Sequence, residues 1–289
     1  MPPASPIERR NERDHGHNHC PLCGPSHHRH EEQPELTIQR ILIYPDAQIP
    51  LHNPRQVNSL HRYIHATKPD RLVIIGDFMN YAGPSRWSKD TRAEYENDVF
   101  RESELGKRFL GDLRRGYDGP VDFVEGNHDA NPRRYLLRHA PALAESNAFN
   151  VETLLDFDSH GIAIVRGSLN IAPGWVAMHG HLDKIRTVTV PGGTAKKFVD
   201  RLHKSVVMGH THRLGLMPHT VGTTSSNSVR WGMEVGNVMD MRKAEYLGLV
   251  TANWQSGFGM LYVEGKRVRP EVIPMDGNGM FIADGKVWG

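Results

Sequence analysis

The chain has 289 residues, which is enough for one large domain or two small ones. Charged residues make up 24% of it and hydrophobic residues 38%, a composition typical of a folded soluble protein rather than a disordered one. No apolar stretch is long enough to span a membrane and the N-terminus lacks the apolar core of a signal peptide, so we expect a cytoplasmic protein without a membrane partner. The formal net charge of +2 neither indicates nor excludes a nucleic-acid partner.

The first 36 residues are rich in Pro, His and charged residues and show no apolar periodicity. We predict that they form a tail, separate from one domain at residues 37–289. The tail contains the Cys-x-x-Cys-Gly pattern of a zinc knuckle. A second Cys-x-x-Cys is absent from the sequence, so a tail that binds metal without a fixed structure is the slightly favoured alternative. A structural Zn²⁺ site in this tail would use four ligands, Cys20, Cys23, His27 and His30.

The first half of the domain alternates between apolar runs typical of buried strands and segments with helical spacing of apolar residues. Asn53-Pro54 and Asn131-Pro132 each provide a capping residue and a proline at the first helical position, which indicates that a helix begins there. Tyr95 and Val99 lie on the predicted apolar face of one long helix. The predicted elements are a strand at 37–44, a helix at 53–68, a strand at 72–75, a helix at 91–115, a strand at 121–124 and a helix after 131.

The second half is richer in strands and has many glycines after residue 212. Strand–helix alternation followed by a strand-rich region predicts an α/β fold with two layered sheets rather than a barrel. The predicted elements here are strands at 162–165, 169–171 and 175–178, a helix at 194–203, a strand at 206–208 and a hairpin of strands at 259–263 and 268–273.

Five short polar stretches occur in order along the domain, and each follows an apolar run. Polar stretches that follow apolar runs are typical of strands whose ends converge on one site. A lone Asp or His at a strand end is usually a cap or a turn residue, but five in order argue against that interpretation. The stretches are Asp46-Ala47-Gln48, Gly76-Asp77-Phe78-Met79-Asn80, Gly126-Asn127-His128-Asp129, His179-Gly180-His181 and Gly209-His210-Thr211-His212.

These stretches combine carboxylate, amide and imidazole groups, which are suitable ligands for divalent metal ions. Asp46 and Asp77 supply negative charge, and one of them must bridge if two ions are bound. Two ions and two aspartates leave a net positive site, which attracts a phosphate anion and stabilises charge that develops on its oxygens. The stretches therefore predict a dinuclear metal centre and a hydrolase that acts on phosphate esters.

The order of these motifs resembles the calcineurin-like metallophosphoesterase superfamily, whose motifs run Asp-x-His, Gly-Asp, Gly-Asn-His-Asp/Glu, His and Gly-His-x-His. The resemblance covers about residues 37–275 and includes every block, and the pattern is similar to members encoded by bacteriophages. It implies a sandwich of two mixed β-sheets flanked by helices, with the metal ions held above the strand ends.

The resemblance also implies a role for each polar residue. Asp77 would bridge the two ions and, with His128, make up the catalytic residues. His128 would stabilise the phosphoryl group or protonate the leaving oxygen. His181 is expected outside the ligand set. The expected metal ligands are Asp46, Gln48, Asp77, Asn127, His179, His210 and His212.

Gln48 departs from the family pattern, which most often has His at this position. A glutamine oxygen is a harder and weaker ligand than imidazole, so we expect Mn²⁺ at this centre, with Zn²⁺, Fe²⁺, Ni²⁺ and Mg²⁺ as alternatives. Gln48 can also serve only to orient a water molecule.

The substrate is less well defined by the sequence. The Gly-Asp-Phe-Met-Asn-Tyr-Ala stretch lacks the Asp-Arg-Gly typical of protein phosphatases, and resembles phosphodiesterases and DNA nucleases of the superfamily. We therefore predict a phosphodiesterase or nuclease acting on DNA, RNA or nucleotides, with a phosphomonoesterase or a non-catalytic binding module as alternatives. Arg133 and Arg134 either bind the substrate phosphate or form a solvated basic face. The oligomeric state is left open.

Overall fold

The computed structural model describes residues 37–86, 88–96, 98–143, 145–182, 184–244 and 252–289. Residues 37–289 form one compact unit. In the described part of the chain, no helix is both long enough and apolar enough to cross a membrane. The predicted tail and its zinc ligands lie outside the described residues, so the zinc knuckle stays a prediction. These ligands are Cys20, Cys23, His27 and His30.

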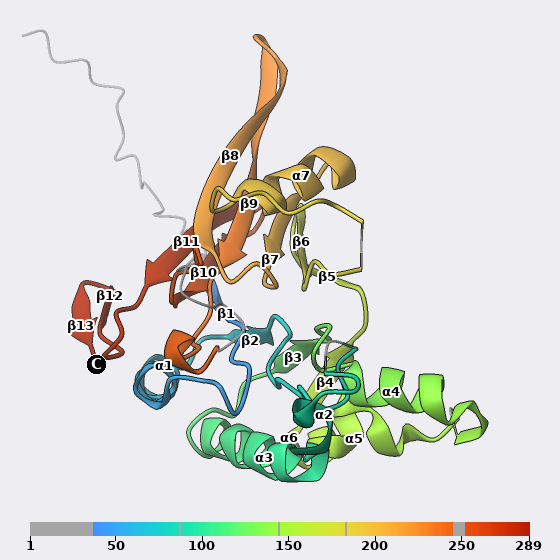
Figure 1. Ribbon diagram of the computed structural model, residues 1–289. Helices are drawn as coiled ribbons and strands as arrows, with labels where there is room; N and C mark the ends of the chain where they lie inside the picture. The colour runs from blue at the N-terminus through green and yellow to red at the C-terminus, as the bar shows by residue number, and fades with distance from the viewer. Residues whose placement is uncertain (1–36, 87, 97, 144, 183, 245–251) are drawn as a thin grey trace, which may run out of the picture. The chain divides into compact units, whose positions relative to one another are not determined.

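The first sheet has six strands in the order β11-β10-β1-β2-β3-β4 (Figure 1). Its four strands from the first half of the domain are parallel, and two strands from the C-terminal hairpin extend it antiparallel at the β1 side. The strands are β1 (Gln39–Tyr44), β2 (Arg71–Ile74), β3 (Val121–Val124), β4 (Ile162–Val165), β10 (Gly257–Glu264) and β11 (Arg267–Pro274).

The second sheet has five strands in the order β5-β6-β7-β9-β8. β6, β7 and β9 are parallel to one another, whereas β5 and β8 pair antiparallel at the two edges. The β8–β9 hairpin extends well beyond the rest of this sheet (Figure 1). The strands are β5 (Ser168–Ala172), β6 (Trp175–Met178), β7 (Ser205–Met208), β8 (Leu214–Thr223) and β9 (Ser226–Val235); β12 (Phe281–Ala283) and β13 (Lys286–Trp288) form a separate pair.

The two sheets pack face to face because alternate residues of each strand point to opposite sides. Ile41 and Ile43 of β1 share one buried cluster with Val207 of β7 and Val235 of β9. The intervening residue Leu42 belongs to a second cluster, which packs under the helices. The predicted α/β sandwich of two mixed sheets is therefore confirmed.

Helices cover the outer faces of both sheets. The predicted helix at 91–115 is in fact two helices, because the side chain of Asp98 accepts hydrogen bonds from the N–H groups of Phe100 and Arg101 and starts a new helix there. Tyr95, expected on its apolar face, is 81% exposed. The helices are α1 (Pro54–Thr67), α2 (Arg92–Glu96), α3 (Val99–Arg115), α4 (Asn131–His139), α5 (Val151–Leu154), α6 (Phe157–His160) and α7 (Gly193–Leu202), with short 3₁₀ turns at Pro141–Leu143, Asn147–Phe149 and Met241–Lys243.

Candidate metal centre

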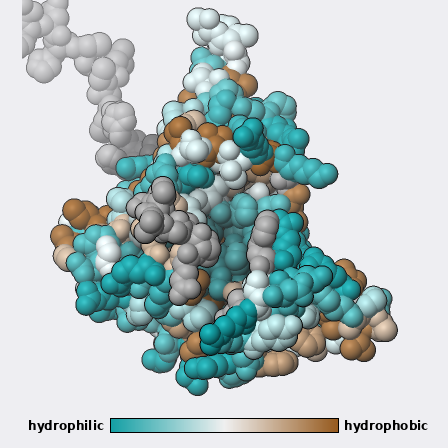
Figure 2. Space-filling view, in the orientation of Figure 1, coloured by the Kyte–Doolittle hydropathy of each residue, from teal (hydrophilic) through white to brown (hydrophobic). Residues whose placement is uncertain are grey.

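The predicted ligands converge where the parallel strands of both sheets end. Figure 2 shows a hydrophilic hollow on this face of the molecule, in the region where β6 and β7 end in Figure 1. The carboxyl ends of parallel strands share one edge of a sheet, so loops that are distant in sequence meet there. The residues that follow these strands are Asp46 after β1, Asp77 after β2, Asn127 after β3, His179 after β6, and His210 and His212 after β7.

The loops that carry the ligands have unusual backbone conformations. Gln48, Asp77, His210 and His212 all have positive φ angles, at 52°, 48°, 67° and 56°. Such conformations are unfavourable for non-glycine residues and cluster at functional sites. Gly126 is needed beside them, because a Cβ at that position would overlap the backbone nitrogen and Oδ1 of Asp77. The chain therefore holds these side chains in place at a cost in backbone strain.

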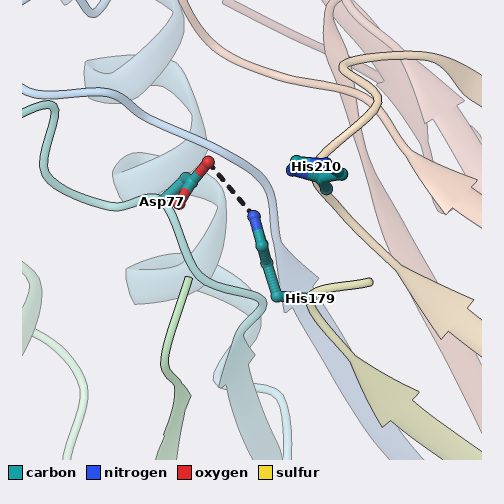
Figure 3. Close-up of side chains that lie close together, drawn as sticks. All are labelled: Asp77, His179 and His210. Atoms are coloured by element: carbon teal, nitrogen blue, oxygen red, sulfur yellow. Dashed lines mark ion pairs between the residues drawn. The ribbon is translucent and has the colours of Figure 1, made fainter. Parts of the chain in front are cut away.

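Asp77, His179 and His210 form the first cluster of possible metal ligands, with their ligand atoms within 4.8 Å of one another. Figure 3 shows the three side chains pointing toward one another, with Asp77 paired to His179. The Nε2 atom of His179 lies 3.1 Å from Asp77 Oδ2 and 3.2 Å from Asn127 Oδ1. His179 Nδ1 donates to the carbonyl of Ile75 at 2.9 Å. Because a carbonyl only accepts, this bond leaves Nε2 as the nitrogen that can bind metal.

Asp46, Asp77 and His212 form the second cluster, again with ligand atoms within 4.8 Å of one another. The Nε2 atom of His212 lies 3.2 Å from Asp46 Oδ2, and Gln48 Nε2 donates to Asp77 Oδ2 at 3.2 Å. Asp77 belongs to both clusters, as a bridging ligand must. All seven predicted ligands therefore lie together.

Three buried atoms in or beside the second cluster support metal binding. Asp46 Oδ1, Gln48 Oε1 and His212 Nδ1 have no hydrogen-bond partner among the described residues. A buried polar atom without a partner is costly, and metal coordination removes that cost. The donor set of carboxylate, amide oxygen and imidazole suits divalent metal ions, so the residues present fit the implied ions.

The charges in the centre are strongly coupled. Burial alone would raise the pKa of Asp77, but the interactions with the neighbouring imidazoles of His179 and His128 outweigh burial and hold it below its ordinary value. Burial alone would lower the pKa of His179, but the Asp77 carboxylate raises it to about 9. Burial also lowers the pKa of His210 to about 4. In the metal-free chain a proton on His179 therefore balances Asp77, and a metal ion must displace that proton to bind.

His128 lies beside the two clusters and belongs to neither. Its backbone N–H donates to Asp77 Oδ1 at 2.8 Å, and its Nδ1 donates to the carbonyl of Asn80 at 2.8 Å. The bond to a carbonyl fixes the tautomer, so Nε2 is the ring nitrogen left for another partner. The geometry thus separates His128 from the residues that can hold metal.

Two buried carboxylates support the ligand loops. Asp129 is fully buried, and its two oxygens accept hydrogen bonds from the N–H groups of Met79 at 3.0 Å and Gly126 at 2.9 Å. Burial and the nearby Asp77 raise the pKa of Asp129, while the two N–H donors oppose that shift. The sequence interpretation missed the second carboxylate, Glu234. A charged residue between Met233 and Val235 in an apolar run was the signal available for it.

Glu234 is fully buried and joins α7 to the last ligand loop. Its Oε1 atom accepts the N–H groups of Thr194 at 2.9 Å and Ala195 at 3.2 Å, both at the start of α7. Its Oε2 atom accepts the hydroxyl of Thr211 at 3.0 Å, between the predicted ligands His210 and His212. One carboxylate thus caps a helix and fixes the loop that carries two histidines.

The two arginines predicted for phosphate binding have different surroundings. The guanidinium of Arg133 is paired at 2.7 Å with Glu125, a buried carboxylate that is 7% exposed. The guanidinium of Arg134 donates to His181 Nε2 at 3.3 Å. The His181 ring centroid lies 5.3 Å from that of His179, so Arg134 is close to the centre while Arg133 is held by Glu125.

The chain is similar in sequence to a known family and to two phage proteins. Residues 39–220 match the family model of the calcineurin-like phosphoesterases. The chain is 46% identical over 252 residues to the Gene 54 proteins of Mycobacterium phage L5 and Mycobacterium phage D29, covering 86% of this chain and 98% of each relative. The solved structure of Vacuolar Protein Sorting 29 from Cryptosporidium parvum is 17% identical with a TM-score of 0.41, covering 86% of this chain and 94% of that one. The phosphoesterase Yfce from E. coli is 14% identical with a TM-score of 0.41, covering 85% and 97%.

The family match spans more than half of the chain, and the two phage relatives are similar over nearly their whole length. The chain therefore belongs to the calcineurin-like phosphoesterase family, and it is a metal-dependent hydrolase of phosphate esters.

Proposed function

We propose that this chain is a phosphodiesterase or nuclease that hydrolyses phosphodiester bonds in nucleic acid or nucleotides at the dinuclear centre. The observation that carries the proposal is the pair of ligand clusters that share Asp77, with His128 beside them and outside both. In this proposal one ion is held by Asp46, Gln48, Asp77 and His212, and the other by Asp77, Asn127, His179 and His210. When bound, such ions act as Lewis acids and lower the pKa of water.

The residues of the chain have complementary roles. Asp77 holds His128 through the backbone N–H of that residue, and Asn80 orients its ring. The remaining nitrogen, Nε2, then faces the substrate. When both ring nitrogens carry a proton, Nε2 can donate to a phosphoryl oxygen or pass its proton to the leaving oxygen. Arg134 adds a positive charge next to His181, where it can attract the substrate phosphate.

The diester is favoured over the monoester on grounds of charge. A phosphate monoester carries more negative charge than a diester and needs more cationic partners. Glu125 neutralises the charge of Arg133. Among the contacts described above, Arg134 pairs with His181 and with no carboxylate. A phosphomonoesterase remains the alternative.

The first experiment compares bis(p-nitrophenyl) phosphate with p-nitrophenyl phosphate, each with Mn²⁺ and the purified full-length chain. We expect faster hydrolysis of the diester. Preference for the monoester would support the phosphatase alternative. No hydrolysis of either ester or of DNA would contradict the proposal and support a binding role.

The second experiment tests the separation of His128 from the ligands. Replacing His128→Ala is expected to lower turnover of the diester about 10²- to 10⁴-fold, the usual contribution of a general acid or base, with metal content unchanged. Asp77→Ala is expected to lower turnover and metal content together. His139→Ala on the exposed surface of α4 is the control and should change neither. Metal is counted by elemental analysis of each purified variant, and loss of metal in the His128 variant would contradict this assignment.

A further inference from the structure

An ion pair closes the loop that carries Asn127 and His128. Glu125 is the last residue before this loop, and Arg133 lies in the first turn of α4, just after it. The Nη2 atom of Arg133 donates to Glu125 Oε2 at 2.7 Å. The carboxylate is 8% exposed and the guanidinium side chain 35%, so the pair lies mostly away from solvent. A contact between the two ends of the loop limits how far the segment between them can move.

Backbone hydrogen bonds make this loop a series of tight turns. The Ala130 N–H donates to the carbonyl of Gly126 at 3.3 Å. The Asn131 N–H donates to the carbonyl of His128 at 3.0 Å. The Arg134 N–H then donates to the carbonyl of Ala130 at 3.0 Å, which continues the chain into α4. A shift at the start of α4 is therefore passed through these turns to His128.

Among the described contacts, the Arg133 pair is what ties the start of α4 to the end of β3. Of the nine residues of this helix, all of them described, only Pro132 is buried, and Ala130 at its N-cap makes no side-chain cap. The helix extends away from the two sheets (Figure 1). The other side-chain contacts of α4 with the rest of the chain run to other segments, namely Asn131 to Tyr81, Arg134 to His181 and Tyr135 to Glu94. Without the ion pair, the far end of the loop would lose its attachment to β3.

The same carboxylate also faces a second arginine. Arg166 lies just after β4, and its Nε atom is 3.4 Å from Glu125 Oε1. Its Nη2 atom donates to both oxygens of Glu152, at 2.7 and 2.8 Å. The two glutamates and the two arginines together carry no net charge. A balanced cluster has no excess positive charge for a substrate phosphate, so Arg133 is better suited to holding the loop than to binding substrate.

We propose that Glu125 and Arg133 form a positioning pair, which holds the loop so that the His128 imidazole keeps its place beside the two ligand clusters. Neither residue contacts the substrate, and both act through His128. This rests on the proposed function, because it takes His128 as the catalytic residue. Two consecutive arginines then have different roles: Arg133 fixes the loop and Arg134 attracts the substrate phosphate.

The kinetic experiment compares Glu125→Gln, Arg133→Ala and the variant with both changes, using bis(p-nitrophenyl) phosphate and Mn²⁺. We expect each single change to lower kcat about 10- to 100-fold, as is usual for residues that orient a functional loop, with a smaller change in KM. The double variant should be no less active than the less active single variant, because both changes remove the same pair. Adding Arg133→Ala to His128→Ala should lower kcat no further, since the pair acts through His128.

Three further variants serve as controls. Arg133→Lys should keep most of kcat, because the described pair uses one guanidinium nitrogen and an ammonium group can supply that contact. Arg134→Ala should raise KM more than it lowers kcat. Arg267→Ala removes an exposed ion pair with Glu264 in the β10–β11 hairpin and should change neither constant.

Hydrogen exchange gives a second measurement that does not need turnover. The His128 N–H donates to Asp77 Oδ1 at 2.8 Å, so an intact loop protects this amide. Mass spectrometry should show faster exchange at the amides of residues 126–131 in Glu125→Gln and Arg133→Ala than in the wild type. Arg133→Lys and Arg267→Ala should exchange there as the wild type does.

The outcomes separate the two proposals. A raised KM with unchanged kcat in Arg133→Ala would overturn the positioning pair and make Arg133 a phosphate ligand. A further loss of kcat when Arg133→Ala is added to His128→Ala would show that the pair does not act through His128. Unchanged kcat and unchanged exchange in both single variants would also overturn the pair, while hydrolysis of the diester by the wild-type chain would leave the phosphodiesterase intact.

Absence of hydrolysis by the wild-type chain, with faster exchange in the two single variants, would overturn the proposed function and support the pair as the attachment of the loop. If Glu125→Gln does not fold, Arg133→Ala decides the matter, because its side chain is partly exposed and Arg166 still faces the Glu125 carboxylate in that variant.

Discussion

The two sheets hold their ligand loops in the same general way but with different chemistry. In the first sheet, Asp129 fixes the loop of Asp77 by accepting two backbone N–H groups. In the second sheet, Glu234 fixes the loop between His210 and His212 through the hydroxyl of Thr211. Both carboxylates are fully buried. The difference lies in the partners, because an N–H group can only donate whereas a hydroxyl can also accept.

The nature of the partner determines which loop depends on a carboxylate. Each oxygen of Asp129 faces a donor that cannot reverse its role. The Oε1 atom of Glu234 accepts both helix N–H groups, and Oε2 faces a hydroxyl that can turn. A side-chain amide can therefore replace Glu234 and cannot replace Asp129 without a clash of donors.

The largest effect is expected for Asp129→Asn. Its amide NH₂ group must face the N–H of either Met79 or Gly126, which leaves a buried donor without an acceptor at a cost of about 2–3 kcal/mol. Glu234→Gln is the matched control and should lose less than about 1 kcal/mol of stability, since its amide can donate to Thr211. Urea unfolding of both variants at neutral pH gives the two free energies, and equal losses would contradict the contrast.

A smaller effect is expected for Thr211→Val, which removes the hydroxyl and leaves Glu234 Oε2 buried without a donor. The loop between His210 and His212 then loses its support, and we expect Mn²⁺ affinity to fall about 10- to 100-fold, as is usual for residues that orient ligands. Thr211→Ser keeps the hydroxyl and should bind Mn²⁺ as the wild type does. Titration calorimetry measures both; a serine variant as weak as the valine variant would show that the methyl group, not the hydroxyl, is what matters.

The smallest effect concerns Glu102 of α3, a third carboxylate that supports the first-sheet loop by accepting the N–H of Tyr81 at 2.9 Å. Burial raises the pKa of Glu102 to about 7, although the Tyr81 N–H opposes the shift. The folded state thus binds this proton more tightly than the unfolded chain, so its stabilising contribution is present below about pH 4.5 and is lost as the pH rises through 7. Glu102→Gln removes the cost of burying the ionised carboxylate, and we expect the variant to be about 1 kcal/mol more stable than the wild type at pH 8.5 and little more stable at pH 5. Thermal unfolding at the two pH values measures this, and a pH-independent difference would rule out the raised pKa as its cause.

Much of the fold could be predicted because its signals are local. The strands at 121–124, 162–165 and 175–178 have the predicted bounds, since each is a short apolar run between turn residues. The predicted cap of α1 is confirmed, because Asn53 accepts the N–H groups of Arg55 and Gln56. The ligand residues could be placed together because each follows a strand, and strand ends of parallel sheets converge.

The features that could not be predicted depend on distant partners. Asn131 was expected to cap α4, but Ala130 is the capping residue and the Asn131 amide donates instead to the carbonyl of Tyr81, 50 residues earlier. Glu234 acts through Thr194 and Thr211, which are 40 and 23 residues away. Arg133, one of the two arginines that the sequence offers for phosphate binding, pairs with Glu125 instead. Each of these contacts is made by the folded chain and has no counterpart in a local pattern.

Glu234 couples the start of α7 to the candidate metal centre, because it accepts hydrogen bonds from both. If His210 and His212 bind metal as proposed, bound metal favours the folded loop. The folded loop keeps the Thr211 hydroxyl on Glu234, and the same carboxylate accepts the N–H groups of Thr194 and Ala195 near the start of α7. Opening of this helix end and release of metal are therefore linked equilibria. Free metal at 100 times its dissociation constant is expected to slow hydrogen exchange at the amides of Thr194 and Ala195 by up to about 100-fold, which is about 2.7 kcal/mol.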